Sequence, residues 1–90
     1  MQENNFNSEE KLIGRVTHFF PHTMAAIVKL EDDVNLGDRV KFQKGENQFE
    51  QEIKSMQVDH QPIQFGKKGD EVAIQTEQKV KEGYLVFKIE

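Results

Sequence analysis

Three histidines are the first side chains in this chain that could do metal chemistry. His18, His22 and His60 would form a zinc site if their imidazoles converged, because imidazole nitrogen is a common zinc ligand. Their spacing matches no familiar zinc-binding pattern, and the alternative is an inward-facing His18 with His22 in a turn. The chain has no cysteine, which excludes a thiolate site. We therefore expect no metal site.

Hydrolytic, calcium and nucleotide sites have weaker support. Ser55, Asp59 and His60 include the side-chain types of a hydrolytic triad, but adjacent residues on a strand point to opposite faces, so Asp59 could not easily orient His60. The acidic run at residues 31–33 lacks the spaced oxygen ligands of a calcium loop, and a solvated turn explains it better. The phosphate-binding pattern Gly-x-x-x-x-Gly-Lys-Ser/Thr is absent. We expect no enzyme activity, no cofactor and no nucleotide.

The stretch HFFPH is the most distinctive candidate for a binding surface. An alternation that points His18 and Phe20 inward places Phe19 outward, where its ring could stack on a base or anchor a partner's side chain. Arg15 shares the parity of Phe19 and could contact a phosphate or a carboxylate. The alternative is that Phe19 packs against the N-terminal segment through Phe6. The predicted contact residues are Arg15, Phe19, Pro21 and His22.

Charge and hydropathy limit the kind of partner. The 12 Lys and Arg against 16 Asp and Glu give a net charge of -4, which argues against a large non-specific grip on a phosphate backbone. Any contact with nucleic acid would have to be local. The N-terminal MQENNFNSEE has no apolar core of a signal peptide, and no apolar run is long enough to span a bilayer. We expect a cytoplasmic protein without a membrane partner.

The elements that must position these residues are short strands, because the dominant hydrophobic period is two. The first run is predicted to point its even-numbered residues, from Leu12 to Phe20, into the core. Near Lys54 and Ser55 the parity changes, which favours a β-bulge over two strands with a loop between them. The pattern predicts an all-β fold, a small closed antiparallel β-barrel of about six to seven strands over residues 11–90, after a flexible segment at residues 1–10.

A short phrase occurs twice, once as NLGDRVKF and once as KKGDEVAI. In both copies Gly-Asp ends a loop and starts an alternating strand. We expect Gly37 and Gly69 to adopt a backbone conformation that other residues avoid, and Asp38 and Asp70 to accept hydrogen bonds from nearby backbone amides. Such turns would fix the register as each strand begins. Two unrelated common turns are the alternative.

The order of these motifs resembles the second domain of translational GTPases such as elongation factor Tu. The motifs are IGRVTHFF, AAIVKL, LGDRVKF, FEQEIKSMQ, KKGDEVAI and VKEGYLVFKI, and the resemblance covers residues 11–90. The chain is most similar to small stand-alone proteins called translation elongation factor-like. It also resembles the C-terminal barrel of collagenase-like peptidases, some of which act in tRNA modification. The resemblance implies the barrel fold and a last turn at Gly83, with Tyr84 where the family usually has Asp.

The resemblance implies a non-catalytic accessory in translation or tRNA modification, with tRNA or ribosomal RNA contacting the residues around Arg15 and Phe19. A function of another class stays open, in which the same aromatic patch docks a larger enzyme or a ribosome-associated protein. Phosphate contacts weaken steeply with added salt, whereas an apolar docking surface does not. A tRNA titration at two salt concentrations would therefore separate the two functions.

Overall fold

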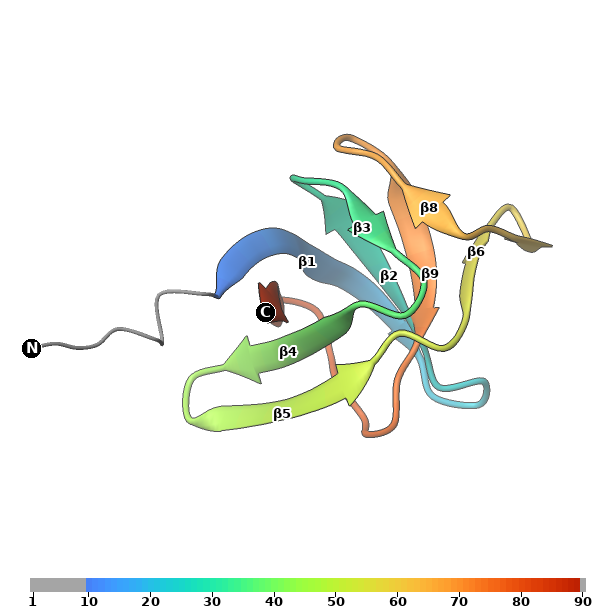
Figure 1. The fold of residues 1–90 in the computed structure, drawn as a ribbon. Coiled ribbons are helices and arrows are strands. Elements are labelled where there is room, and N and C mark those ends of the chain that lie inside the picture. Colours follow the sequence, from blue (N-terminus) through green and yellow to red (C-terminus); the bar gives the residue numbers. More distant parts are fainter. Residues whose placement is uncertain (1–9, 90) are drawn as a thin grey trace, which may run out of the picture.

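The computed structural model describes residues 10–89, which form antiparallel sheets without a helix (Figure 1). The strands are β1 (Lys11–Phe20), β2 (Ala25–Leu30), β3 (Val34–Asn35), β4 (Arg39–Lys44), β5 (Asn47–Glu52), β6 (Met56–Val58), β7 (Gln61–Pro62), β8 (Phe65–Gly66), β9 (Glu71–Gln75) and β10 (Leu85–Ile89). The all-β antiparallel prediction is confirmed. The strands outnumber the predicted six to seven because β3, β7 and β8 are only two residues long, too short for alternation to reveal.

The larger sheet is a ladder of eight strands in the order β5-β4-β10-β1-β2-β9-β6-β7, and β3 pairs with β8 in a second sheet. The ladder has two ends, so its backbone does not close on itself as the predicted barrel would. At one end the buried side chain of Gln51 makes the link from β5 to the end of β9. Its Nε2 donates to the carbonyl of Gln75 at 2.9 Å, and its Oε1 accepts from the N–H of Glu77 at 2.8 Å.

Strand β1 carries two irregularities that the alternation did not predict. Its register against β10 shifts after Leu12, and its register against β2 shifts after Val16. One extra residue in a strand turns every following side chain to the other face. Leu12 and Phe20, predicted to face inward, are therefore exposed at 40% and 46%, and Phe19 packs half-buried against the core. The predicted parity of β1 is therefore correct for Gly14 and Val16, which are buried, and wrong for Leu12, His18 and Phe20.

The break between β5 and β6 also differs from the prediction. Strand β5 pairs with β4, whereas β6 pairs with β9, and residues 53–55 between them belong to neither ladder. Ile53 and Met56 are buried, and Phe49 and Val58 pack against the core. All four apolar side chains reach the core as expected. The predicted bulge near Lys54 and Ser55 is wrong, and the alternative of two strands with a loop is correct.

Aliphatic side chains from most strands, with the ring of Phe42, fill the core between the sheets. Phe42 is fully buried and stacks on Phe49, with 5.2 Å between ring centroids. The buried apolar residues are Ile13, Val16, Ala26, Val28, Leu30, Val34, Val40, Phe42, Ile53, Met56, Val72, Ile74, Val80, Tyr84 and Val86. No helix in the described part of the chain is long and apolar enough to cross a membrane.

Glu10, the first described residue, belongs to the segment predicted to be flexible and contacts strand β4. Glu10 accepts a hydrogen bond from Lys41 Nζ at 2.7 Å, and the Lys41 side chain is only 11% exposed. The same ammonium group lies 5.2 Å from the centroid of the Phe87 ring. Glu10 thus contacts the sheet through Lys41, and the predicted boundary after residue 10 stays a prediction. Residues 1–9, including Phe6, lie outside the described range.

The two Gly-Asp phrases form turns of the same geometry. Gly37 has φ 94° and Gly69 has φ 95°. In each turn the aspartate, Asp38 or Asp70, accepts a hydrogen bond through Oδ2 from the backbone N–H three residues earlier, at 2.8 Å and 3.0 Å. The N–H of each aspartate donates back to the carbonyl of that same residue, a pattern typical of a type II turn. Gly83, with φ 100°, has the same place in a third turn, in which the N–H of Tyr84 donates to the carbonyl of Lys81. This turn has Tyr84 in place of the aspartate.

Replacing Gly37 or Gly69 with valine should lower the free energy of unfolding by about 1 to 3 kcal/mol, because a β-branched residue is strained at positive φ. An added Cβ meets no atom within 4 Å at either position, so the cost is conformational rather than steric. Chemical denaturation measures it. Gly69→Asn is the matched control and should lose less, since asparagine tolerates positive φ better. Wild-type midpoints for both valine variants would show that the turns do not need glycine.

Candidate functional site

The structure separates the residues of the predicted contact. Arg15 lies exposed on the outer face of β1 and forms a surface ion pair, whereas Phe19 is turned toward the core by the second irregularity in that strand. Pro21 and His22 are exposed in the turn that joins β1 to β2. The exposed ring at this end of β1 is Phe20, not Phe19. The predicted pairing of Arg15 with an outward Phe19 is therefore wrong.

The histidines and the triad candidates do not assemble into a site. Within residues 10–89, no three His, Asp or Glu side chains converge where a metal ion could bind. Asp59 and His60 form the two-residue turn between β6 and β7, with φ 52° and 65°, and both are exposed. The ring of His18 packs edge-on against Phe20, with 4.5 Å between centroids.

The acidic run at residues 31–33 is engaged in local contacts. They are Arg15 to Glu31 at 3.6 Å, Lys11 Nζ to Asp32 Oδ2 at 2.8 Å, and the N–H of Lys68 donating to Asp33 Oδ1 at 3.1 Å. The hydrogen bond from Lys11 is the main cause that holds the pKa of Asp32 below its usual value, and the N–H of Asp33 adds to it. These contacts tie the end of β2 to the start of β1 and to the turn before β9.

The small β3–β8 sheet instead presents an aromatic side chain to solvent. Val34 and Gly66 pair and face the core, so their neighbours on the two strands face outward, and Phe65 is 46% exposed. A Cβ at Gly66 would approach Leu30 Cδ1 to 2.7 Å, so glycine lets β8 lie close against the core. The Phe65 ring is thereby held on the surface of a sheet whose inner side is fixed by packing.

A cavity of about 240 Å³ lies beside β8, between residues 62–64 and the break that follows β5. It is lined by Leu36, Lys54, Ser55, Met56, Pro62, Ile63 and Gln64. Leu36 is 39% exposed, whereas Met56 is buried. The volume is below that of pockets that enclose drug-sized ligands, so the cavity suits one flat ring or one apolar side chain.

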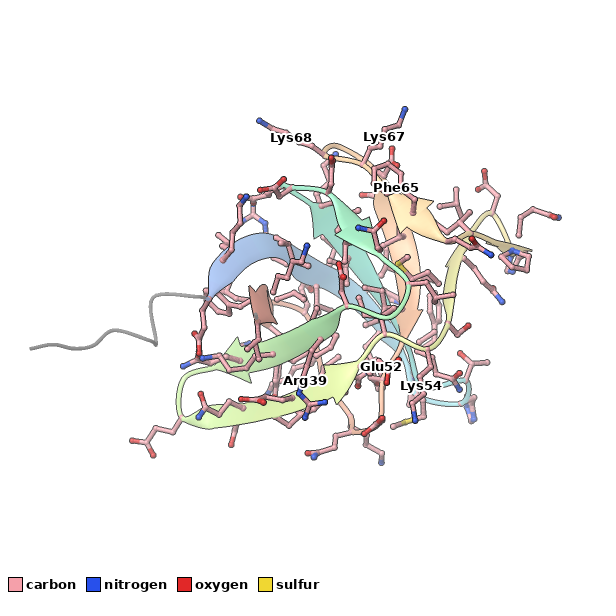
Figure 2. The ribbon with its side chains drawn as sticks, viewed as in Figure 1. Arg39, Glu52, Lys54, Phe65, Lys67 and Lys68 are labelled. Carbon is pink, nitrogen blue, oxygen red and sulfur yellow. The ribbon has the colours of Figure 1, made fainter. Side chains whose placement is uncertain are left out.

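Lysines lie at both ends of this surface. Figure 2 shows Lys67 and Lys68 projecting from the turn beyond Phe65, and Lys54 toward the other end of the same view. Within residues 10–89 the ammonium groups of Lys54 and Lys67 form no ion pair, whereas Lys68 is close enough to Asp32 to affect its charge. We call Leu36, Lys54, Phe65, Lys67 and the cavity between them the β8 face.

Acidic side chains also border the β8 face. Glu52 lies between Arg39 and Lys54 in the same view (Figure 2), and Arg39 forms an ion pair with Glu50 at 3.5 Å. On this face, the lysines without an ion pair to a described residue are Lys54, Lys67 and Lys68. This agrees with the net charge of -4, which leaves room only for a local contact with an anion.

Sequence reasoning missed the β8 face because β7 and β8 are too short to alternate. In the segment QPIQFGKKGD the Gly-Asp phrase at its end was interpreted as a turn before a strand. One signal in it could have indicated the site. Phe65 is followed directly by glycine and then by two lysines, which places a ring beside cations on a segment with no inward-facing partner for that ring.

Comparisons with known proteins indicate where this fold occurs. No family model matches the chain. It is 32% identical over 87 residues to an uncharacterized protease of Methanocaldococcus jannaschii, an alignment that covers 94% of this chain and 21% of that protein. The chain thus spans about a fifth of the length of the curated relative.

Two solved structures share the fold, both of the C-terminal domain of a Geobacillus thermoleovorans protein described as a U32 peptidase. One has a TM-score of 0.82 at 17% identity and covers 99% of this chain and 100% of the domain. The selenomethionine variant has a TM-score of 0.79 at 20% identity and covers 84% and 96%. These relatives fit the expected resemblance to the C-terminal part of collagenase-like peptidases. They leave the link to elongation factors a prediction.

Proposed function

We propose that this chain is a non-catalytic all-β module that makes a local RNA contact, as an accessory in translation or tRNA modification. The observation that carries the proposal is the exposed Phe65 ring, which follows Gln64 of the cavity lining in the chain and lies next to Lys67. Lys54 lines the same cavity, and within residues 10–89 neither lysine forms an ion pair. A non-catalytic role is supported by the solved domain, which has the same fold and is the C-terminal part of a larger protein.

The β8 face matches what an unpaired stretch of RNA offers. A base can stack on an aromatic side chain, which contributes about 1 to 3 kcal/mol of binding free energy. Lys67, next to Phe65, would contact a phosphate of that nucleotide, and Lys54, at the other end of the face, would contact a phosphate further along the strand (Figure 2). The cavity between them would take a second flat ring against Leu36 and Ile63. A duplex presents no unstacked base, so we expect single-stranded or loop RNA to be preferred.

A titration of labelled total tRNA, followed by fluorescence anisotropy at 50 and 200 mM salt, tests the function. With two to three lysine–phosphate contacts, each contributing about 0.7 to the salt slope, the affinity should fall roughly tenfold between the two concentrations. The variant Lys54→Gln with Lys67→Gln should bind more weakly at low salt and show a flatter salt dependence. Absence of saturable binding at 50 mM salt would refute the RNA contact.

The exposed Leu36 at the cavity favours a second function, a protein-docking module for a larger enzyme or a ribosome-associated partner. An apolar side chain of the partner would fill the cavity. Such binding would persist at high salt, because burial of apolar surface does not depend on screened charges. Retention of a partner protein, but not of RNA, on the immobilised chain at high salt would favour this function over the first.

A further inference from the structure

Strand β5 lies at one end of the larger ladder (Figure 1), so one of its sides has no neighbouring strand in that ladder. Its hairpin with β4 has a two-residue turn between Lys44 and Asn47, so these two residues form a hydrogen-bonded pair. Hydrogen-bonded pairs then recur at every second residue, and the bonds that Ile53 makes with Gly37 and Asp38 fit the same phase. The backbone N–H and C=O of the intervening residues must therefore point away from β4.

These outward groups belong to Gln48 and Glu50, and both residues are exposed. Among the described residues, neither backbone N–H nor C=O of the two has a partner on that side. At the C-terminal end of β5 the same side is already occupied. The Gln51 side chain reaches to the end of β9, and the carbonyl of Glu52 accepts a hydrogen bond from Gln51 Nε2 at 3.3 Å. The free edge is thus the first part of β5, which we call the β5 edge and define as Asn47–Gln51.

The two faces beside the β5 edge differ in chemistry. On the inner face Phe49 is half-buried, and its ring stacks on Phe42, so a side chain added beside β5 could cover the part of the ring that is still exposed. On the outer face Glu50 and Glu52 are exposed, and Glu46 lies exposed in the turn. Arg39 forms an ion pair with Glu50 at 3.5 Å. The carboxylates of Glu46 and Glu52 have no ion pair in the described part of the chain.

We propose that the β5 edge binds an extended segment of a partner protein whose basic residues alternate with apolar ones. The segment would add as one more strand, with its backbone paired to Gln48 and Glu50. Its apolar side chains would lie beside Phe49 and its lysine or arginine side chains beside the carboxylates on the outer face. This surface is separate from the β8 face, and the inference does not depend on the proposed RNA contact.

The charge of the β5 edge selects against other occupants. A second copy of the chain pairing through its own β5 would set glutamates against glutamates, which is destabilising across strands. RNA would be repelled by the same carboxylates. Because only a few residues can pair, the contact is small, and we expect it to be transient unless other surfaces of the partner join it.

The probe is a blocked peptide of alternating lysine and valine, six residues long, added to the 15N-labelled chain. We expect shifts of the amide signals of residues 47–51 and slower hydrogen exchange at Gln48 and Glu50. A glutamate–valine peptide should have no effect. Two further lysine–valine peptides are N-methylated at every second amide, one at the odd-numbered and the other at the even-numbered positions. Both keep every charge, but in one of them the methyl groups replace the N–H groups that would pair with β5. At least one should lose binding by tenfold or more. Equal binding of both methylated peptides would overturn the proposal.

The variant Gln48→Pro gives a second test on the protein side. It removes an outward N–H without removing a bond to β4, and proline is tolerated on edge strands. We expect at least tenfold weaker peptide binding while the amide spectrum stays folded. Unchanged binding, or peptide-induced shifts centred on the β8 face, would contradict the inference. If the Gln48→Pro variant does not fold, the two methylated peptides still test the proposed strand pairing on the wild-type chain.

Discussion

Replacing Gly14 with alanine should lower the free energy of unfolding by about 3 kcal/mol, the upper end of what overpacking usually costs. Gly14 is buried in β1, where it pairs with β2 on one side and β10 on the other. A Cβ there would approach the carbonyl oxygen of Lys29 to 2.6 Å and Val28 Cγ1 to 2.8 Å. The first of these atoms is backbone, so β1 and β2 would have to separate. Urea denaturation measures the loss.

Gly66→Ala is the matched control. It also adds a methyl group to a buried glycine, but its nearest neighbour, Leu30 Cδ1 at 2.7 Å, is the end of a flexible side chain that can move. We expect a loss of about 1 kcal/mol, the lower end of overpacking. If Gly14→Ala unfolds at the wild-type urea concentration, or costs less than Gly66→Ala, the close approach of β1 to β2 is not as described.

Replacing Gln51 with methionine should cost about 3 kcal/mol or more, because three backbone groups lose a hydrogen-bond partner and each lost partner costs about 1 to 3 kcal/mol. Methionine has the length of glutamine and would fill the same space. The carbonyl of Gln75 and the N–H of Glu77 would lose the hydrogen bonds at 2.9 Å and 2.8 Å that now link β5 to the end of β9. The loss appears both in urea denaturation and as faster hydrogen exchange of the Glu77 amide.

Gln48→Met serves as the control for this variant, since Gln48 is an exposed glutamine on the same strand. Its unfolding free energy should stay within about 0.5 kcal/mol of wild type, as for most surface substitutions. Equal stability of the two variants would mean that Gln51 does not hold β5 to the end of β9. Unchanged exchange at Glu77 in the Gln51 variant would lead to the same conclusion.

Some of the fold could be predicted because it depends on local rules. Period-two alternation identified the long strands, and the Gly-Asp phrase identified turns whose glycines have φ 94° and 95°. The same rule failed in β1, because its residues between Leu12 and Phe20 include large apolar side chains on both parities. Alternation alone cannot show where an extra residue is inserted. The closing role of Gln51 was also hidden, since its hydrogen bonds are to residues about 25 positions away along the chain.

The candidate site was harder to predict than the fold. Phe19 and Phe20 are adjacent, and which of them faces solvent depends on a one-residue shift in register. Phe65 lies in a two-residue strand that has no pattern of its own, and its exposure follows from Val34 and Gly66 packing inward. An aromatic residue next to a glycine and two lysines is a local signal. That the same face also carries Lys54 and a cavity is a property of the tertiary fold alone.

The proposed RNA contact is tested most directly by comparing Phe65→Ala with Phe20→Ala in tRNA titrations at low salt. Both rings are 46% exposed in the wild-type chain, but Phe20 lies near the site predicted from the sequence and Phe65 lies on the β8 face. Loss of one base stack should weaken binding of the Phe65 variant by about 5- to 100-fold, with the affinity of the Phe20 variant unchanged. Wild-type affinity for Phe65→Ala, or a larger loss for Phe20→Ala, would contradict the assignment of the β8 face.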